Sequence, residues 1–273
     1  MRFGDICLEW TTISKMKLAI VIPAYNEERR IGKTLDAFIT YYNTRKGVKT
    51  KIWVIINNTR DKTLEIVQSY KKKYPHKIDY LNLIKGGKGY AVIEGFKCAY
   101  KEKYDLIGFV DADLATSPLA FDDLIHKRGK AEGVIASRYL PGSRCTPTLT
   151  FRRAVVGKLF NTFTRLLLHL PESDTQCGAK VFSKRAIAHI ISSVKVTQWA
   201  FDIELLYECH QAGFTIKEVP TTWIDIEGSK VKLVRTSIQM FFAVIQLRLK
   251  KSPLHCLLTP LKKQVLFIWK IVQ

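Results

Sequence analysis

The sequence predicts an α/β protein with one open, mostly parallel sheet and helices on both faces. Two observations carry this prediction. Four short stretches of nearly continuous apolar residues have the length of buried strands, and amphipathic segments of helical period separate them. Parallel strands buried on both faces are apolar throughout, and consecutive ones are joined through a helix. The 273 residues suffice for one such domain with an extension.

The first half of the chain alternates strands and helices in this way. In the first helix, Ile31, Leu35 and Phe38 recur at helical spacing. Asn26 is expected to cap this helix, with acidic residues in its first turn. The predicted strands are 17–24, 51–57, 77–83 and 104–113, and the other predicted helices are 63–74 and 89–102.

The second half is less regular, and no repeat or linker divides it. We expect strands at 131–139 and 178–183, two short strands within 214–226, and helices at 151–170, 199–211 and 233–251. The predicted organisation is a leader without fixed structure at 1–16, one domain at 17–230, and basic amphipathic helices at 231–273. Met16 directly precedes the first strand, which leaves open whether translation starts at Met1 or Met16.

Polar residues follow each of the first four strands. They are Pro23–Glu27, Asn57–Asp61, Gly86–Lys88 and Asp111–Asp113. Open parallel sheets bind ligands at the carboxyl ends of their strands, so we expect all four clusters to meet in one crevice.

Asp111 and Asp113 are the most informative of these residues. If both belong to the strand, residues i and i+2 share one face and their carboxylates point the same way. Mg²⁺ takes one or two carboxylates together with substrate phosphates, and Mn²⁺ also favours oxygen ligands. A polar turn would explain the tripeptide equally well in isolation, but its place at a strand end favours a metal site.

Other candidate motifs stay ambiguous at the level of single residues. The acidic run after Pro23 is compatible with a simple helix start, and Gly86–Gly89 lacks the spacing of a phosphate-binding loop. For Asp174, the sequence favours neither a structural nor a functional role over the other. Cys177 is expected to be a small buried residue, because no histidine is placed to activate it.

The net charge of +20 is unevenly distributed. No acidic residue lies between Glu132 and Glu172 or after Glu227. Such a bias predicts a polyanionic partner: nucleic acid, an anionic membrane or a phosphorylated substrate; a generally solvated basic surface is the alternative. A nucleic-acid-binding protein would interleave exposed aromatic residues with its cations, whereas here the aromatic residues fall within apolar stripes.

The amphipathic segments 151–170 and 233–250 combine wide apolar stripes with flanking basic residues. This pattern suits helices that lie in a membrane interface, although core helices would show similar stripes. No apolar run is long enough to predict a transmembrane helix. The N-terminus lacks the layout of a signal peptide, and the six scattered cysteines predict neither a zinc site nor a disulfide scaffold, which favours a reducing compartment.

Several motifs, taken in order, resemble the family-2 glycosyltransferases, and among them the polyprenyl-phosphate sugar transferases of the dolichyl-phosphate β-glucosyltransferase branch. They are VIPAYNEE, NNTRDKT, GGKGYAV, VDADLA, ASRY, DTQCGAKVF, WAFDIELLY and WIDIEGSKV. The resemblance runs from Lys17 to Lys251. It implies a GT-A fold for residues 17–230 and inverting transfer of a hexose from a nucleotide sugar to dolichyl or another polyprenyl phosphate.

The resemblance also implies roles for individual residues. For the nucleotide sugar they are Pro23, Tyr25, Glu27, Asn57, Lys88, Asp111, Ala112, Asp113 and Gln176. For the acceptor phosphate they are Arg138, Arg152, Arg153, Trp199, Asp202, Ser229 and Lys230. Asp111 and Asp113 would hold Mg²⁺ or Mn²⁺, and the catalytic set would be Asp111, Asp113, Asp174 and Arg138. Asp174 would orient the sugar or act as a base.

One departure bears on the donor. Relatives carry an Asp-Asp-Gly-Ser run after the second strand, whereas this chain has Ile56, Asn57, Asn58 and Thr59 there. We expect UDP-glucose as the donor, with a GDP-mannose-dependent mannosyltransferase as the alternative. The expected location is the cytoplasmic face of a membrane, with peripheral or monotopic attachment, and the oligomeric state stays open.

Overall fold

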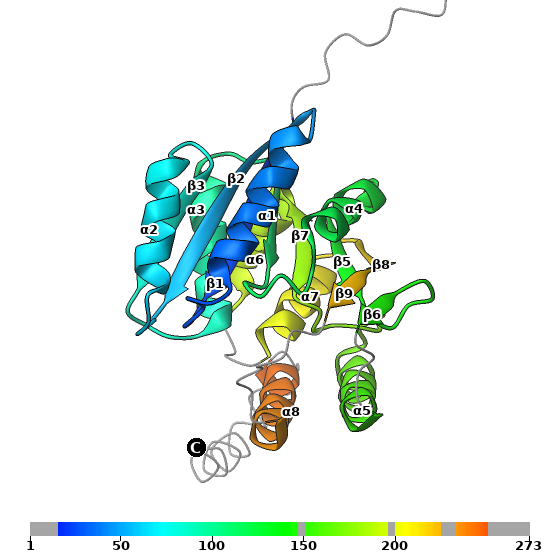
Figure 1. The fold of residues 1–273 in the computed structure, drawn as a ribbon. Coiled ribbons are helices and arrows are strands. Elements are labelled where there is room, and N and C mark those ends of the chain that lie inside the picture. Colours follow the sequence, from blue (N-terminus) through cyan, green and yellow to red (C-terminus); the bar gives the residue numbers. More distant parts are fainter. Residues whose placement is uncertain (1–15, 147–150, 196–199, 225–232, 251–273) are drawn as a thin grey trace, which may run out of the picture.

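The computed structural model describes residues 16–146, 151–195, 200–224 and 233–250. A seven-stranded sheet lies at its centre (Figure 1). Its strands are β1 (Met16–Ala24), β2 (Val48–Asn57), β3 (Ile78–Leu83), β4 (Leu106–Val110), β5 (Gly133–Ser137), β7 (Ala179–Ser183) and β8 (Ile216–Pro220), in the spatial order β3-β2-β1-β4-β7-β5-β8. Two short parallel strands, β6 (Arg144–Thr146) and β9 (Thr222–Ile224), form a second sheet.

The predicted α/β fold with a mostly parallel sheet is confirmed, with one reversal. β7 runs antiparallel to both of its neighbours, β4 and β5. Because Ala179, the first residue of β7, pairs with Val110, the last residue of β4, the segment that precedes β7 arrives at the carboxyl end of β4. This reversal brings the loop around Asp174 to the same edge of the sheet as Asp111.

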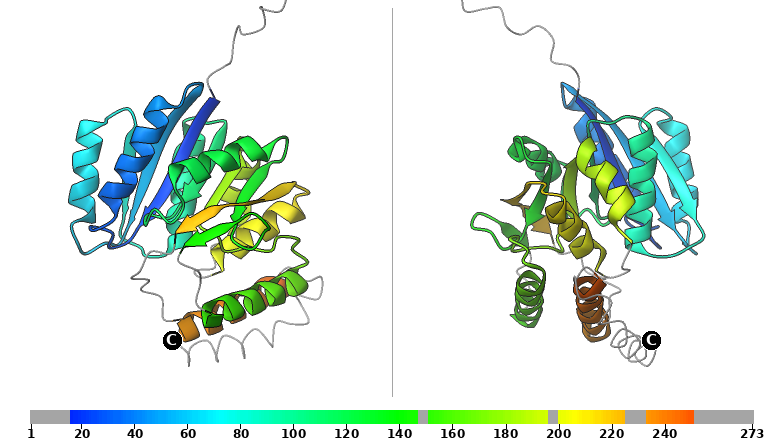
Figure 2. Two further views of the ribbon diagram at one scale, coloured as in Figure 1. Left: turned by 45° about the vertical axis from the view of Figure 1, so that its right-hand side comes forward. Right: turned by 180° about the vertical axis from the view of Figure 1, so that it is seen from behind.

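Helices cover both faces of the sheet (Figures 1 and 2). They are α1 (Ile31–Thr44), α2 (Thr63–Lys73), α3 (Lys88–Lys101), α4 (Pro118–Arg128), α5 (Phe151–Leu168), α6 (Lys184–Ser193), α7 (Phe201–Gln211) and α8 (Leu233–Lys250). One core contains residues of α1, α2 and α4, and the other contains residues of α3, α6 and α7. In β1, Ile20 faces the first core and Val21 the second, which explains why this strand is apolar throughout. Full burial of each such side chain contributes about 1.5–3 kcal/mol.

The helices α5 and α8 lie beyond the end of the sheet toward which the parallel strands point (Figures 1 and 2). Their rings Phe163 and Phe241 stack with centroids 4.4 Å apart. Ala243, Val244 and Leu247 anchor α8 in the core that also contains α7. The predicted helices are therefore present, while the domain boundary at residue 231 stays a prediction. The predicted leader, apart from Met16, and the chain after Lys250 lie outside the described residues.

The predicted start of the first helix was wrong. The helix α1 begins at Ile31, with Arg30 in the capping position and no acidic residue in the first turn. Asn26 adopts φ +52° and, instead of capping α1, accepts hydrogen bonds from the Thr59 hydroxyl and the Arg60 N–H. The polar run after β1 is thus a loop tied to the loop after β2.

No bounds were predicted for three elements: α4, β6 and α6. The helix α4 has only a weakly amphipathic sequence, although Ser117 caps it and Pro118 occupies its first turn. The helix α6 follows β7 without a loop, because Ser183 both ends the strand and caps the helix.

Candidate active site at the carboxyl ends of the strands

The four polar clusters that follow β1 to β4 meet at one edge of the sheet, as the sequence predicted. Hydrogen bonds and ion pairs connect neighbouring clusters: Asn26 N–H to Thr59 Oγ1 (2.9 Å), Glu27 N–H to Thr63 Oγ1 (2.8 Å), Asn58 N–H to Leu83 O (2.8 Å) and Lys88 Nζ to Asp111 Oδ1 (2.6 Å). Three non-glycine residues in these loops adopt positive φ, namely Asn26, Asn58 and Leu114. Such backbone strain is characteristic of ligand-binding sites.

Asp111 and Asp113 come together by a different geometry from the one predicted. The strand β4 ends at Val110, so both aspartates belong to the following turn and strand alternation does not orient them. In that turn, Asp113 Oδ1 accepts a hydrogen bond from the Ala115 N–H at 3.0 Å. Burial and the negative charge of Asp111 raise the pKa of Asp113. The two carboxylates are therefore close enough to repel each other.

A lysine and a glycine define the position of the Asp111 side chain. Lys88, in the first turn of α3, places its ammonium 2.6 Å from Asp111 Oδ1. On the other side, a Cβ atom added to Gly178 would lie only 1.9 Å from Asp111 Oδ2. Gly178 was missed at the sequence level. A glycine is required at this position because any side chain would collide with Asp111, and no pattern in the sequence reveals that contact.

These residues fit a divalent cation that is shared with a diphosphate. Among the described residues, no group of three or more His, Cys, Asp or Glu side chains could enclose a metal ion. Mg²⁺ requires fewer protein ligands, however, because it takes one or two carboxylates and completes its coordination with phosphate oxygens and water. The repulsion between Asp111 and Asp113, and the ammonium already held against Asp111, both indicate a position that favours positive charge.

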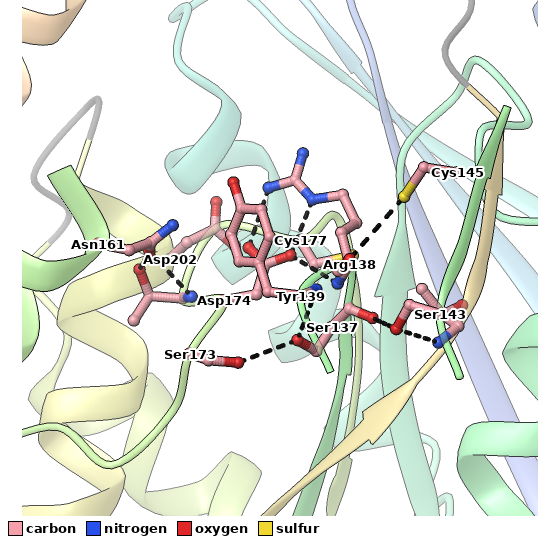
Figure 3. A network of polar contacts seen from close by, with 12 residues as sticks. Ser137, Arg138, Tyr139, Ser143, Cys145, Asn161, Ser173, Asp174, Cys177 and Asp202 are labelled. Carbon is pink, nitrogen blue, oxygen red and sulfur yellow. Dashed lines mark hydrogen bonds and ion pairs between the residues drawn. The ribbon is translucent and has the colours of Figure 1, made fainter. Parts of the chain in front are cut away.

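Arg138, directly after the last residue of β5, forms a buried ion pair with Asp174 (Figure 3). The guanidinium donates from Nε to Asp174 Oδ2 at 2.8 Å and from Nη2 to Oδ1 at 2.9 Å, and the Arg138 N–H also donates to Oδ2. Asp174 is fully buried. Burial alone would raise the pKa of Asp174, but the hydrogen bonds and charge of Arg138 hold it below its ordinary value. Nη1 of Arg138 makes no hydrogen bond to a described residue.

Two further side chains, both missed at the sequence level, hold the loop that carries Asp174. Glu218 of β8 accepts hydrogen bonds from the Ser173 N–H, the Ser173 hydroxyl and the Asp174 N–H at 2.7–3.0 Å. Asn161 of α5 accepts from the Thr175 hydroxyl at 2.9 Å. Contacts of this kind between distant segments carry no sequence signature. Together with Arg138, they fix the conformation of the loop.

The predicted nucleotide-side residues differ in exposure. Pro23 belongs to the end of β1, and Tyr25, in the loop that follows, is 49% exposed. Glu27 is held by two hydrogen bonds from Arg30, at 2.6 and 2.7 Å. Asn57 is buried at the end of β2, and its Oδ1 has no hydrogen-bond partner among the described residues. Ala112 is also buried, and the Gln176 amide contacts Met240 Sδ of α8 at 3.8 Å.

The predicted acceptor-side residues are only partly described. Asp202, in the first turn of α7, lies 4.0 Å from Lys88 and 2.6 Å from Lys180, which places it against a predicted donor-side residue. Arg152 and Arg153 belong to the first turn of α5, but their side chains are outside the described part. Trp199, Ser229 and Lys230 lie outside the described residues altogether.

Comparison with known families shows the family of this chain. The model of the glycosyl transferase family 2 matches residues 19–191, well over half of the chain. The chain belongs to this family. It is therefore a glycosyltransferase, and the family resemblance inferred from the motifs is confirmed.

Named members of the family match most of the chain. The dolichyl-phosphate β-glucosyltransferase of Dictyostelium discoideum is 32% identical over 261 residues, which cover 91% of this chain and 79% of that protein. The human protein of the same name is 29% identical, over 88% of this chain and 77% of its own length.

Solved structures show the same fold. Glucosyl-3-phosphoglycerate synthase from Mycobacterium tuberculosis superposes with a TM-score of 0.62 at 16% identity, over 85% of this chain and 80% of that one. The predicted GT-A architecture is thus confirmed. The identity is too low for this likeness to show more than the fold.

Proposed function

We propose that this glycosyltransferase moves glucose from UDP-glucose onto dolichyl or another polyprenyl phosphate, with inversion to a β-linked product. The observation that carries the proposal is the position of Asp111, held between Lys88 and Gly178 beside Asp113 at the carboxyl edge of the sheet. The names of the matching relatives support both the sugar and the acceptor, since they are dolichyl-phosphate β-glucosyltransferases from several organisms.

The donor would lie across the strand ends against Pro23, Tyr25, Glu27, Asn57, Lys88, Ala112 and Gln176. The side-chain amide of Asn57 can both donate and accept hydrogen bonds, which is compatible with the carbonyl and N–H groups of uracil.

Asp111 and Asp113 would hold Mg²⁺ or Mn²⁺ against the diphosphate. When bound, the metal ion supplies positive charge for the leaving nucleoside diphosphate. A solved complex of the Mycobacterium tuberculosis synthase with Mn²⁺ and UDP-glucose supports this assignment. Lys88 adds a second positive charge at the same place, because its ammonium already contacts Asp111 and can turn toward a phosphate oxygen.

Arg138 would orient the acceptor phosphate, together with Arg152, Arg153, Trp199, Ser229 and Lys230. A phosphate is already an anionic nucleophile, so it needs positioning more than it needs a base. Asp174 is poorly suited to be a base because it is buried and its pKa is lowered by Arg138. We assign it a positioning role: it fixes the guanidinium and leaves Nη1 available for the phosphate.

The reaction would take place on the cytoplasmic face of a membrane, with peripheral or monotopic attachment. Leu159 and Leu166 of α5 are 67% and 72% exposed, and this helix lies at the same end of the molecule as the candidate site. Lys158 and Arg165 are exposed on the same helix. This combination suits insertion of apolar side chains between anionic headgroups. In the described part of the chain, no helix is long and apolar enough to cross a bilayer.

A lipid-extraction assay tests the proposed function. The full chain is incubated with Mg²⁺, a polyprenyl phosphate and one radiolabelled nucleotide sugar at a time, and the organic phase is counted. We expect label from UDP-glucose only when the polyprenyl phosphate is present. If label is transferred only from GDP-mannose, the enzyme is a mannosyltransferase and not a glucosyltransferase. No transfer from any nucleotide sugar would refute the proposal.

A further inference from the structure

Lys180 is a completely buried lysine between apolar residues of the strand β7. Its ammonium donates to Asp202 Oδ1 at 2.6 Å and to the Cys177 carbonyl at 2.7 Å, and it lies 5.3 Å from the centre of the Phe109 ring. A buried charge is tolerated only when it is paired and hydrogen-bonded. Since Lys180 is completely buried, any effect that it has on a bound substrate must be exerted through Asp202.

The pair continues as a chain of alternating charges that ends at the candidate metal site. Asp202 Oδ2 lies 4.0 Å from Lys88 Nζ, and Lys88 Nζ lies 2.6 Å from Asp111 Oδ1. Lys88 also lies 5.7 Å from the ring of Phe109, which Lys180 contacts as well. Two ammonium groups thus share one carboxylate and one aromatic ring, and only Lys88 reaches the site.

We propose that Lys180 is a positioning residue of the donor site, acting through Asp202 on Lys88. The inference rests on the proposed function insofar as it needs a nucleoside diphosphate at this edge of the sheet. Lys180 neutralises Asp202 and occupies one of its oxygens, so Asp202 competes less for Lys88, which lies 4.0 Å from its other oxygen and 2.6 Å from Asp111. Lys88 therefore stays at Asp111, from where it can turn to a diphosphate. Asp202 then belongs to the donor side rather than to the acceptor.

Loss of Lys180 would change this balance in a defined direction. Asp202 is only 14% exposed, and without Lys180 its nearest cation among the described residues is Lys88. A largely desolvated carboxylate draws a neighbouring ammonium strongly. Lys88 would then bind Asp202 and become less available to a diphosphate. The affinity for the nucleotide would fall, even though Lys180 itself never touches it.

Calorimetric titration of the full chain with UDP in the presence of Mn²⁺ tests this inference without requiring sugar transfer. We expect Lys180→Met to weaken UDP binding about tenfold, the effect of losing one charge-assisted contact. The double variant Lys180→Met/Asp202→Asn should return to within about threefold of the wild type, because no carboxylate remains to hold Lys88. If the pair only tied β7 to α7, the double variant would bind as weakly as Lys180→Met.

Asp122→Asn is the matched control. Asp122 is another buried carboxylate, which accepts hydrogen bonds from Tyr41 of α1 and from Arg45 and does not belong to the candidate site. The Asp122→Asn variant should have a lower melting temperature and an unchanged affinity for UDP. The inference would be overturned, and the proposed function left standing, by either of two results: Lys180→Met binds UDP as tightly as the wild type, or the double variant does not recover the affinity for UDP. A wild-type protein that binds neither UDP nor GDP would overturn the proposed function and the inference with it.

Discussion

Replacing Gly178 by alanine should inactivate the site without unfolding the protein. The added Cβ would lie 1.9 Å from Asp111 Oδ2 and 2.6 Å from its Cγ, and real Cβ atoms do not approach other atoms to less than 3.0 Å. Asp111 must therefore withdraw by about 1.5 Å to reach an ordinary contact of 3.4 Å. Its side chain is partly exposed and can do so, at the expense of its ion pair with Lys88.

A displacement of this size at a catalytic group costs on the order of 100-fold in rate. We therefore expect kcat/KM for sugar transfer to fall about 100-fold in Gly178→Ala, while the melting temperature changes little. The control is Gly32→Ala in α1, where the added Cβ would meet Tyr70 at an ordinary 3.5 Å and activity should persist. Unchanged kcat/KM in Gly178→Ala would refute the role given to the Asp111 position.

Three further predictions concern stability and membrane attachment. Arg138→Met leaves the fully buried Asp174 without its partner and should lower the free energy of unfolding by about 3–5 kcal/mol in urea denaturation, with most of the loss recovered in Arg138→Met/Asp174→Asn. The pKa of Asp174 is lowered from 3.8 in the folded state, so the stabilisation by its carboxylate is complete above pH 3.8 and is lost as the pH falls through the folded pKa. The difference in unfolding free energy between wild type and Asp174→Asn should therefore be constant above pH 5 and shrink below pH 4. A difference that grows in acid would contradict this account. Leu166→Glu should weaken binding to anionic vesicles about tenfold in co-sedimentation. The control Leu119→Glu, at a similarly exposed leucine of α4, should not weaken it. Equal binding by the two variants would show that α5 does not contact the membrane.

The architecture was predictable because its physical cause is local. Strands buried on both faces must be apolar throughout, so β1, β2 and β4 are visible in the sequence. Since parallel strands end at the same edge, the meeting of Lys88 with Asp111 followed from the fold class alone.

The parts that were missed depend on contacts between distant segments. The direction of β7 is not encoded in its own five residues, yet it decides that Gly178 packs against Asp111. Lys180 was visible as a single charge in an apolar strand, which signals a buried pair, but its partner Asp202 lies in a different element. The start of α1 was misplaced because Asn26 has a partner in the loop after β2, and that partner competes with helix capping.

The most direct test of the central claim compares the wild type with Asp113→Ala in one transfer experiment. Both proteins are given UDP-[¹⁴C]glucose, a polyprenyl phosphate and Mg²⁺, and circular dichroism verifies that both are folded. The wild type should deliver label to the organic phase and lose this activity with a chelator, whereas Asp113→Ala should transfer none. Equal transfer by the two proteins would contradict the assignment of the diphosphate and its metal ion to the carboxyl end of β4.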